Sequence, residues 1–109
     1  MSKSTKPQSV DAVAFAKAIA DDTRQRIMRL CCCNRLTVGE ITAKIGVSQP
    51  TVSHHLAILR EAGLIDCERE GREAYYGLNQ ERITVCCNSL LLQFAPQLTD
   101  PKLTVPVVR

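Results

Sequence analysis

The stretch TVGEITAKIGVSQPTVSHHLAILREAG, residues 37–63, decides the fold of this chain. It opens with Thr37 and Glu40 at the spacing of a capping box, in which each side chain bonds a backbone N–H that the helix leaves unpaired. The short helix that follows ends at Gly46, and Ser48 is a good N-cap for the next one. A glycine near the end of the stretch breaks that second helix. The stretch therefore predicts two short helices joined by a brief turn.

Two further helices are expected before this stretch. Asp21 and Asp22 provide a break and an N-cap for a helix that stops near Asn34. An earlier helix is indicated by apolar residues at helical spacing from residue 10 onward. Its predicted apolar face comprises Val10, Val13, Ala14, Phe15, Ala18 and Ile19.

After the stretch the apolar period changes to two. Residues 64–69 and 73–78 are typical of strands, and residues 70–72 of a tight turn between them. Helical spacing resumes at Glu81, where the predicted apolar stripe is Ile83, Cys87, Leu90 and Phe94. Helices followed by a charged hairpin and a last helix predict a winged helix-turn-helix, which is mainly helical with a β-hairpin wing.

The length and composition place this fold in one soluble domain. The chain has 109 residues, of which 45% are hydrophobic and 23% charged, both ordinary for a globular protein. We expect a tail over 1–8, the domain over 9–95 and a proline-punctuated arm over 96–109. No stretch suits a bilayer or a secretory signal, so the expected location is cytoplasmic with no membrane partner. A net charge of +3 permits nucleic-acid binding without requiring it.

The exposed side of the helix over 48–62 predicts contacts with double-stranded DNA. Its amide, hydroxyl and imidazole groups can reach base edges in a major groove, and no acidic residue lies between Ser48 and Arg60. Two arginines at the hairpin tip suit backbone or minor-groove contacts. The predicted DNA-binding residues are Gln49, Pro50, Thr51, Ser53, His54, His55, Arg69 and Arg72. Arg24, Arg26 and Arg29 are either further phosphate contacts or a solvated helix face.

The run Ser-Gln-Pro-Thr-Val-Ser-His-His-Leu over 48–56, with Ala-Asp-Asp-Thr-Arg over 20–24 and the wing's Tyr75-Tyr76, resembles ArsR/SmtB-type metalloregulatory repressors. The resemblance spans about residues 10–95. It implies a homodimeric repressor that leaves a palindromic operator when a ligand binds. It also implies that the first and last helices form the dimer interface.

Three ligand sites used in this family do not match this chain. The zinc site needs carboxylates and histidines on the last helix, whereas both histidines here, His54 and His55, lie on the recognition helix. The common arsenic site resembles Cys-Val-Cys, but the corresponding stretch over 37–39 is Thr-Val-Gly. A third site places cysteines in the recognition helix, and residues 48–62 contain none.

The cysteines lie elsewhere, mostly in two clusters, 31–33 and 86–87. Thiolate is a soft ligand suited to As(III), Sb(III), Cd(II) or Pb(II), and three sulfurs suffice for a pyramidal metalloid. Some arsenic-responsive members use a vicinal pair with a distant cysteine that resembles Cys33. We therefore predict a metalloid site, within or between subunits, and no organic cofactor. Its ligands are Cys33, Cys86 and Cys87, with Cys32 as the weaker alternative to Cys33.

Other interpretations stay open. The same repressor could respond to thiol oxidation or reactive sulfur through cysteines on the second and last helices. Some thiols could only pack, since free cysteine behaves as a small hydrophobe; this applies to Cys31, Cys67 and Cys87. A protein-binding winged helix is the more distant alternative. An enzyme is not expected, because the chain has no Cys-x-x-Cys and no glycine-rich phosphate loop, and both histidines lie on the DNA face.

Overall fold

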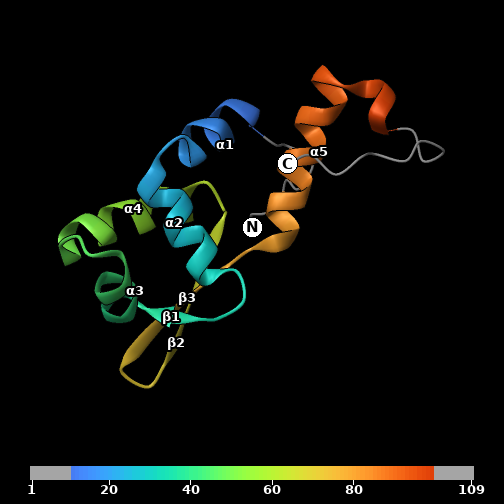
Figure 1. Ribbon diagram of the computed structural model, residues 1–109. Coiled ribbons are helices and arrows are strands. Elements are labelled where there is room, and N and C mark those ends of the chain that lie inside the picture. Colours follow the sequence, from blue (N-terminus) through green and yellow to red (C-terminus); the bar gives the residue numbers. More distant parts are fainter. Residues whose placement is uncertain (1–10, 100–109) are drawn as a thin grey trace.

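The structure, a computed structural model, describes residues 11–99 and has the predicted four helices, hairpin and last helix in the expected order, with two further short elements (Figure 1). The predicted tail and most of the predicted arm lie outside the described residues. No helix within 11–99 has the length and apolar content to cross a bilayer. The elements are α1 (Ala12–Ile19), α2 (Asp22–Cys31), β1 (Leu36–Thr37), α3 (Val38–Ile45), α4 (Gln49–Glu61), β2 (Ile65–Glu70), β3 (Glu73–Leu78), α5 (Gln80–Phe94) and the 3-10 helix η2 (Pro96–Thr99).

Side-chain caps begin the helices where the sequence predicted them. Thr37 and Glu40 form the capping box of α3, with N–H···O distances of 3.1 and 2.9 Å. Asp21 caps α2 by accepting from the Arg24 N–H at 3.0 Å, and this hydrogen bond lowers the pKa of the Asp21 carboxyl. Gly46 ends α3 with a φ of 87°, a left-handed conformation that favours glycine. Both caps and this break are thus confirmed.

The end of α4 turns the chain into the wing through a Schellman motif. The Leu64 N–H donates to the Leu59 carbonyl at 2.9 Å, and the Gly63 N–H donates to the Arg60 carbonyl at 2.9 Å. Gly63 has a φ of 79°, which this motif requires. Its Cα faces Arg82 of α5, and an added Cβ would lie 3.3 Å from Arg82 Nε. The residue that leads from α4 into the wing, Gly63, therefore lies against the first turn of α5.

The wing is part of a three-stranded antiparallel sheet in the order β1-β3-β2. Strands β2 and β3 form the predicted hairpin, joined through Gly71 with a φ of 62°. Strand β1, which pairs Leu36 with Tyr76, was not predicted. It has only two residues, too few to show a period of two. This strand connects the helix-turn-helix to the wing.

One core is formed by side chains of α1, α2, α3, α4, the base of the wing and α5. Two predicted apolar faces were partly wrong. Val13 on α1 is 63% exposed, and on α5 the buried cysteine is Cys86, whereas Cys87 and Phe94 are exposed. Helix α2 also ends at Cys31, three residues before the predicted stop. The buried core residues are Phe15, Ala18, Ile27, Cys31, Ile41, Ile45, Val52, Leu56, Leu59, Leu64, Ile65 and Cys86.

We predict that Gly63→Ala lowers the free energy of unfolding more than Gly46→Ala does. Both place a Cβ on left-handed backbone, which costs about 1–2 kcal/mol. At Gly46 the new Cβ meets nothing within 4 Å, whereas at Gly63 it presses on the Arg82 side chain. Urea denaturation of the two variants measures the difference. Equal losses of stability would show that the Arg82 side chain moves away from the new Cβ without a cost in free energy.

Candidate nucleic-acid interface and thiol sites

The N-terminal half of α4 presents a polar face to solvent. Ser48 caps the helix: its Oγ lies 2.9 Å from Thr51 Oγ1 and accepts from the Thr51 N–H at 3.3 Å. Burial of the apolar side of α4 turns the other side outward. Five of the predicted DNA-binding residues lie on this outer side and are exposed. They are Gln49, Pro50, Thr51, Ser53 and His54.

His55 differs from its neighbours, because it is half-buried and faces α2. Its Nδ1 lies 3.1 Å from Arg24 Nη1. The same guanidinium donates to the Ala18 carbonyl at 2.6 Å and to the Lys17 carbonyl at 3.1 Å, at the end of α1. Arg24 thus connects α1 to α4, a role that helical spacing does not reveal. In this position His55 orients the recognition helix.

The wing tip carries the other two predicted DNA contacts. Arg69 and Arg72 are both exposed, on either side of the tight turn at Gly71. The Arg69 guanidinium lies 3.5 Å from the Arg72 carbonyl, so it folds back over the turn. Two guanidinium groups on a narrow hairpin suit contacts with phosphate oxygens or a minor groove.

A second basic region lies between α2 and α3. Arg26, Arg29 and Lys44 line a hollow of about 270 Å³ together with two apolar side chains. Arg26 also donates to the Ile45 carbonyl at 3.0 Å, so it caps α3 as well as carrying charge. This region adds positive charge beside the helix-turn-helix.

All six thiols are free, and they differ in exposure. Cys31 and Cys86 are buried, and burial raises the pKa of Cys31 to about 11 and that of Cys86 above its ordinary value. Cys33 and Cys87 are exposed, whereas Cys32 and Cys67 are half-buried. Consecutive residues of a helix point about 100° apart. For this reason Cys86 is buried in the core while its neighbour Cys87 is exposed.

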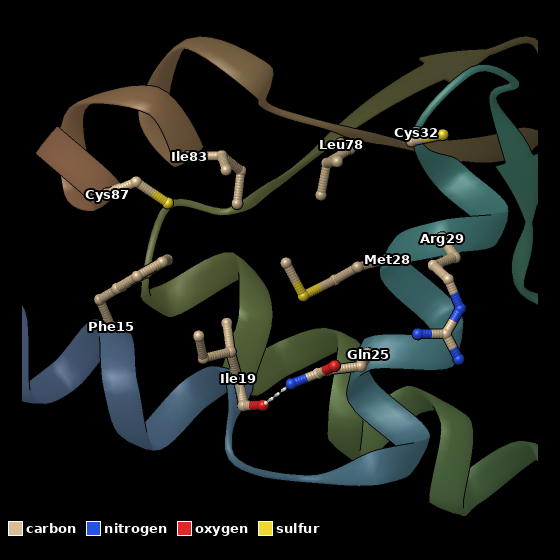
Figure 2. A pocket seen from close by; sticks show the side chains of 9 residues that line it. All are labelled: Phe15, Ile19, Gln25, Met28, Arg29, Cys32, Leu78, Ile83 and Cys87. Carbon is tan, nitrogen blue, oxygen red and sulfur yellow. Dashed lines mark hydrogen bonds between the residues drawn. The ribbon is translucent and has the colours of Figure 1, made fainter. Parts of the chain in front are cut away.

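Cys87 and Cys32 line one apolar cavity of about 360 Å³ between α1, α2 and α5 (Figure 2). The Cys87 sulfur points into the cavity, whereas the Cys32 sulfur points away from it at the opposite end (Figure 2). The walls between them are Phe15, Ile19, Gln25, Met28, Arg29, Leu78 and Ile83.

The two thiols that do meet are neighbours in the sequence. Cys32 Sγ lies 3.1 Å from Cys33 Sγ, just after the end of α2. Their hydrogen bond raises the pKa of Cys32. Within the described part of one protomer, no three Cys, His, Asp or Glu side chains converge closely enough to hold a metal ion. The structure therefore does not bring Cys33, Cys86 and Cys87 together in a single copy.

A helix-turn-helix with a polar recognition face and a wing that carries two arginines at its tip defines this chain as a winged-helix DNA-binding protein. The sequence profile of the bacterial regulatory protein, arsR family, matches residues 21–66. The transcriptional repressor SdpR of Bacillus subtilis (strain 168) is 43% identical over 63 residues, 58% of this chain and 70% of that protein. The chain belongs to the ArsR family, as the sequence predicted, and its relatives are transcription regulators, not enzymes.

Two further likenesses concern arsenic. The arsenic resistance transcriptional regulator ArsR1 of Pseudomonas putida (strain KT2440) is 46% identical over 66 residues, 60% of this chain and 52% of that protein. A crystal structure described as a possible transcriptional regulator for arsenical resistance superimposes with a TM-score of 0.63 at 26% identity. It covers 87% of this chain and 95% of the other.

We predict that iodoacetamide modifies the native, reduced protein in the order set by exposure. Cys33 and Cys87 react first, and Cys31 and Cys86 react last, since burial both shields these two thiols and disfavours their thiolates. Peptide mass spectrometry after a short pulse measures each site, with urea-unfolded protein as the control. Labelling of Cys86 as fast as Cys87 would contradict the orientation of α5.

Proposed function

We propose that this ArsR-family protein is a dimeric repressor that binds a palindromic operator and leaves it when a trivalent metalloid binds cysteine thiolates. Arsenite is the proposed inducer, with antimonite as a close analogue and Cd(II) or Pb(II) as softer alternatives. The observation that carries the proposal is the pairing of an exposed polar recognition face with free thiols on α5 and beyond α2.

The dimer is supported by an exposed apolar surface on α1, α5 and η2. Large apolar side chains exposed together mark interaction sites in soluble proteins. Helices α1 and α5 contact one another, so their exposed sides can form one surface. Its large side chains are Val13, Val85, Leu91, Leu92, Phe94 and Leu98, of which Phe94 is 78% exposed. A two-fold symmetric pair would place two α4 helices on two half-sites of a palindrome.

The three-thiolate site predicted from the sequence, Cys33 with Cys86 and Cys87, stays a proposal. Cys33 and Cys87 are accessible. Cys86 is 2% exposed, so it would have to turn out of the core before it could bind an ion. A complete set of three sulfurs would also need a contribution from the second subunit.

A second candidate is release by thiol oxidation or reactive sulfur. The observation that favours it is the cavity shared by Cys32 and Cys87, which lie at its two ends (Figure 2). A polysulfide that oxidised both thiols and was itself reduced to sulfide would join the end of α2 to α5 through a sulfur bridge, once the Cys32 sulfur had turned toward the cavity. Arsenite and a polysulfide, each tested on the same complex, distinguish the two inducers.

Two variants distinguish contacts with DNA bases, which give sequence specificity, from contacts with phosphate groups. Gln49→Ala is expected to weaken binding to the specific operator by about 1–3 kcal/mol and to leave binding to unrelated DNA unchanged. Arg72→Gln is expected to weaken both equally and to reduce the slope of log affinity against log salt by about 1. Fluorescence anisotropy on both DNAs measures these effects. Binding independent of salt would instead support a protein-binding winged helix.

Arsenite titration tests the proposed inducer. The reduced protein is bound to a labelled fragment of its own upstream DNA, and arsenite is added while anisotropy is followed. We expect dissociation that reaches completion near two metalloids per dimer, with arsenate as the unreactive control. Tight binding unmoved by arsenite and abolished by polysulfide would replace this function with the second candidate.

A further inference from the structure

The loop from Cys32 to Arg35, here called the thiol loop, connects the end of α2 to β1. Its first two residues hold their sulfurs 3.1 Å apart. This separation is well beyond the roughly 2.05 Å of a disulfide bond, so both thiols are free to react. Cys33 is exposed and Cys32 is half-buried, which leaves the pair open to solvent on one side.

The thiol loop is anchored to α5 at its first residue. Gln80, the first residue of α5, donates from Nε2 to the Cys32 carbonyl at 2.8 Å. Gln80 is exposed, so water can replace this hydrogen bond if the loop moves. The residue that carries one thiol of the pair therefore also contacts the first residue of the helix proposed for dimerisation.

The other end of the loop is anchored to the wing. Arg35 forms an ion pair with Glu68 of β2 at 3.0 Å and donates to the Tyr75 carbonyl of β3 at 3.3 Å. Its side chain also packs over Gly77, where an added Cβ would lie 3.1 Å from Arg35 Nη1. The ion pair is exposed, and such pairs contribute only about 0.2–1 kcal/mol. A modest change in the loop is enough to shift this contact.

We propose that Cys32 and Cys33 together form a two-thiolate site for trivalent arsenicals, and that arsenic bound there shifts the contacts of the thiol loop with α5 and the wing. This inference rests on the proposed function and assigns the binding of the metalloid to the vicinal pair Cys32 and Cys33. With arsenite, As(OH)₃ + 2 RSH gives (RS)₂AsOH + 2 H₂O. Two As–S bonds form, two As–O bonds break, and each thiol proton leaves in a water molecule. No electron is transferred.

The geometry of the pair favours an arsenic bridge over a disulfide. Adjacent residues have Cα atoms 3.8 Å apart, below the usual range of 4.4–6.8 Å for a disulfide. A disulfide would also have to bring the sulfurs a further ångström together. An arsenic atom bonded to both sulfurs leaves them in contact with one another, close to where they already lie.

Phenylarsonous acid, which carries two exchangeable hydroxyls, tests the two-thiolate site directly. Native mass spectrometry of the reduced wild-type protein is expected to show one phenylarsenic group per protomer. Because two linked thiols bind more tightly than one by about 10²–10⁴-fold, Cys32→Ser and Cys33→Ser should each lose this affinity. Cys67→Ser, at a half-buried thiol outside both cysteine clusters, is the control and should retain it. Retention in both single variants of the pair would overturn the site.

Anisotropy on operator DNA with the same probe separates this inference from the function on which it rests. Release of the wild type that is lost in Cys33→Ser and kept in Cys67→Ser supports the pair as the sensor. Release that persists in Cys33→Ser overturns the pair but leaves the repressor. A wild-type protein that carries phenylarsenic and stays on the operator overturns the proposed inducer function.

A variant on α5 tests the coupling. Gln80→Met removes the donor to the Cys32 carbonyl and should leave phenylarsenic binding intact. It should also reduce the ratio of operator affinities measured without and with the probe. Gln93→Met is a matched change on the same helix, at an exposed glutamine that donates to Ser89 Oγ at 3.4 Å, and it should leave the ratio at its wild-type value. An unchanged ratio in Gln80→Met would contradict transmission through this hydrogen bond.

Discussion

The rotation of α4 about its own axis is the constraint on which the DNA-binding surface depends. Val52, Leu56 and Leu59 have at most 2% of their surface exposed, because they pack against α2 and α3. Burying side chains of this size contributes about 1.5–3 kcal/mol each. A turn by one residue, about 100°, would expose all three. The polar face with Gln49 and Ser53 points to solvent because the apolar face of α4 must be buried in the core. The contact between Arg24 and His55 stabilises the same orientation of the helix.

The sequence predicted the parts of the fold that depend on local chemistry. The capping box at Thr37, the left-handed glycines at Gly46 and Gly63, and the alternation in the wing each carry their own signal over a few residues. Strand β1 was missed because two residues have no period. The face of α5 was misassigned because apolar residues surround most of that helix, so spacing alone does not choose between Cys86 and Cys87.

In the candidate site, too, the features that depend on local sequence could be predicted and the contacts between distant residues could not. The exposed recognition residues follow from the helix register, so most of them could be predicted. Contacts between distant residues could not: Arg24 with His55 are 31 positions apart, and Gln80 with Cys32 are 48 apart. The cysteine clusters were visible in the sequence, but their orientation was not. The structure separates two buried thiols from the exposed ones and brings Cys32 and Cys33 into contact.

The thiol loop contacts α5 through the Cys32 carbonyl and the wing through Arg35, and we propose that arsenic bound by the vicinal pair changes both contacts. Hydrogen–deuterium exchange of the reduced, DNA-free protein, with and without phenylarsonous acid, tests this connection most directly. We expect faster exchange in the first turn of α5 and in β3, where local opening follows the loss of the loop contacts, and no change in α4. A change confined to residues 32–35 would contradict it.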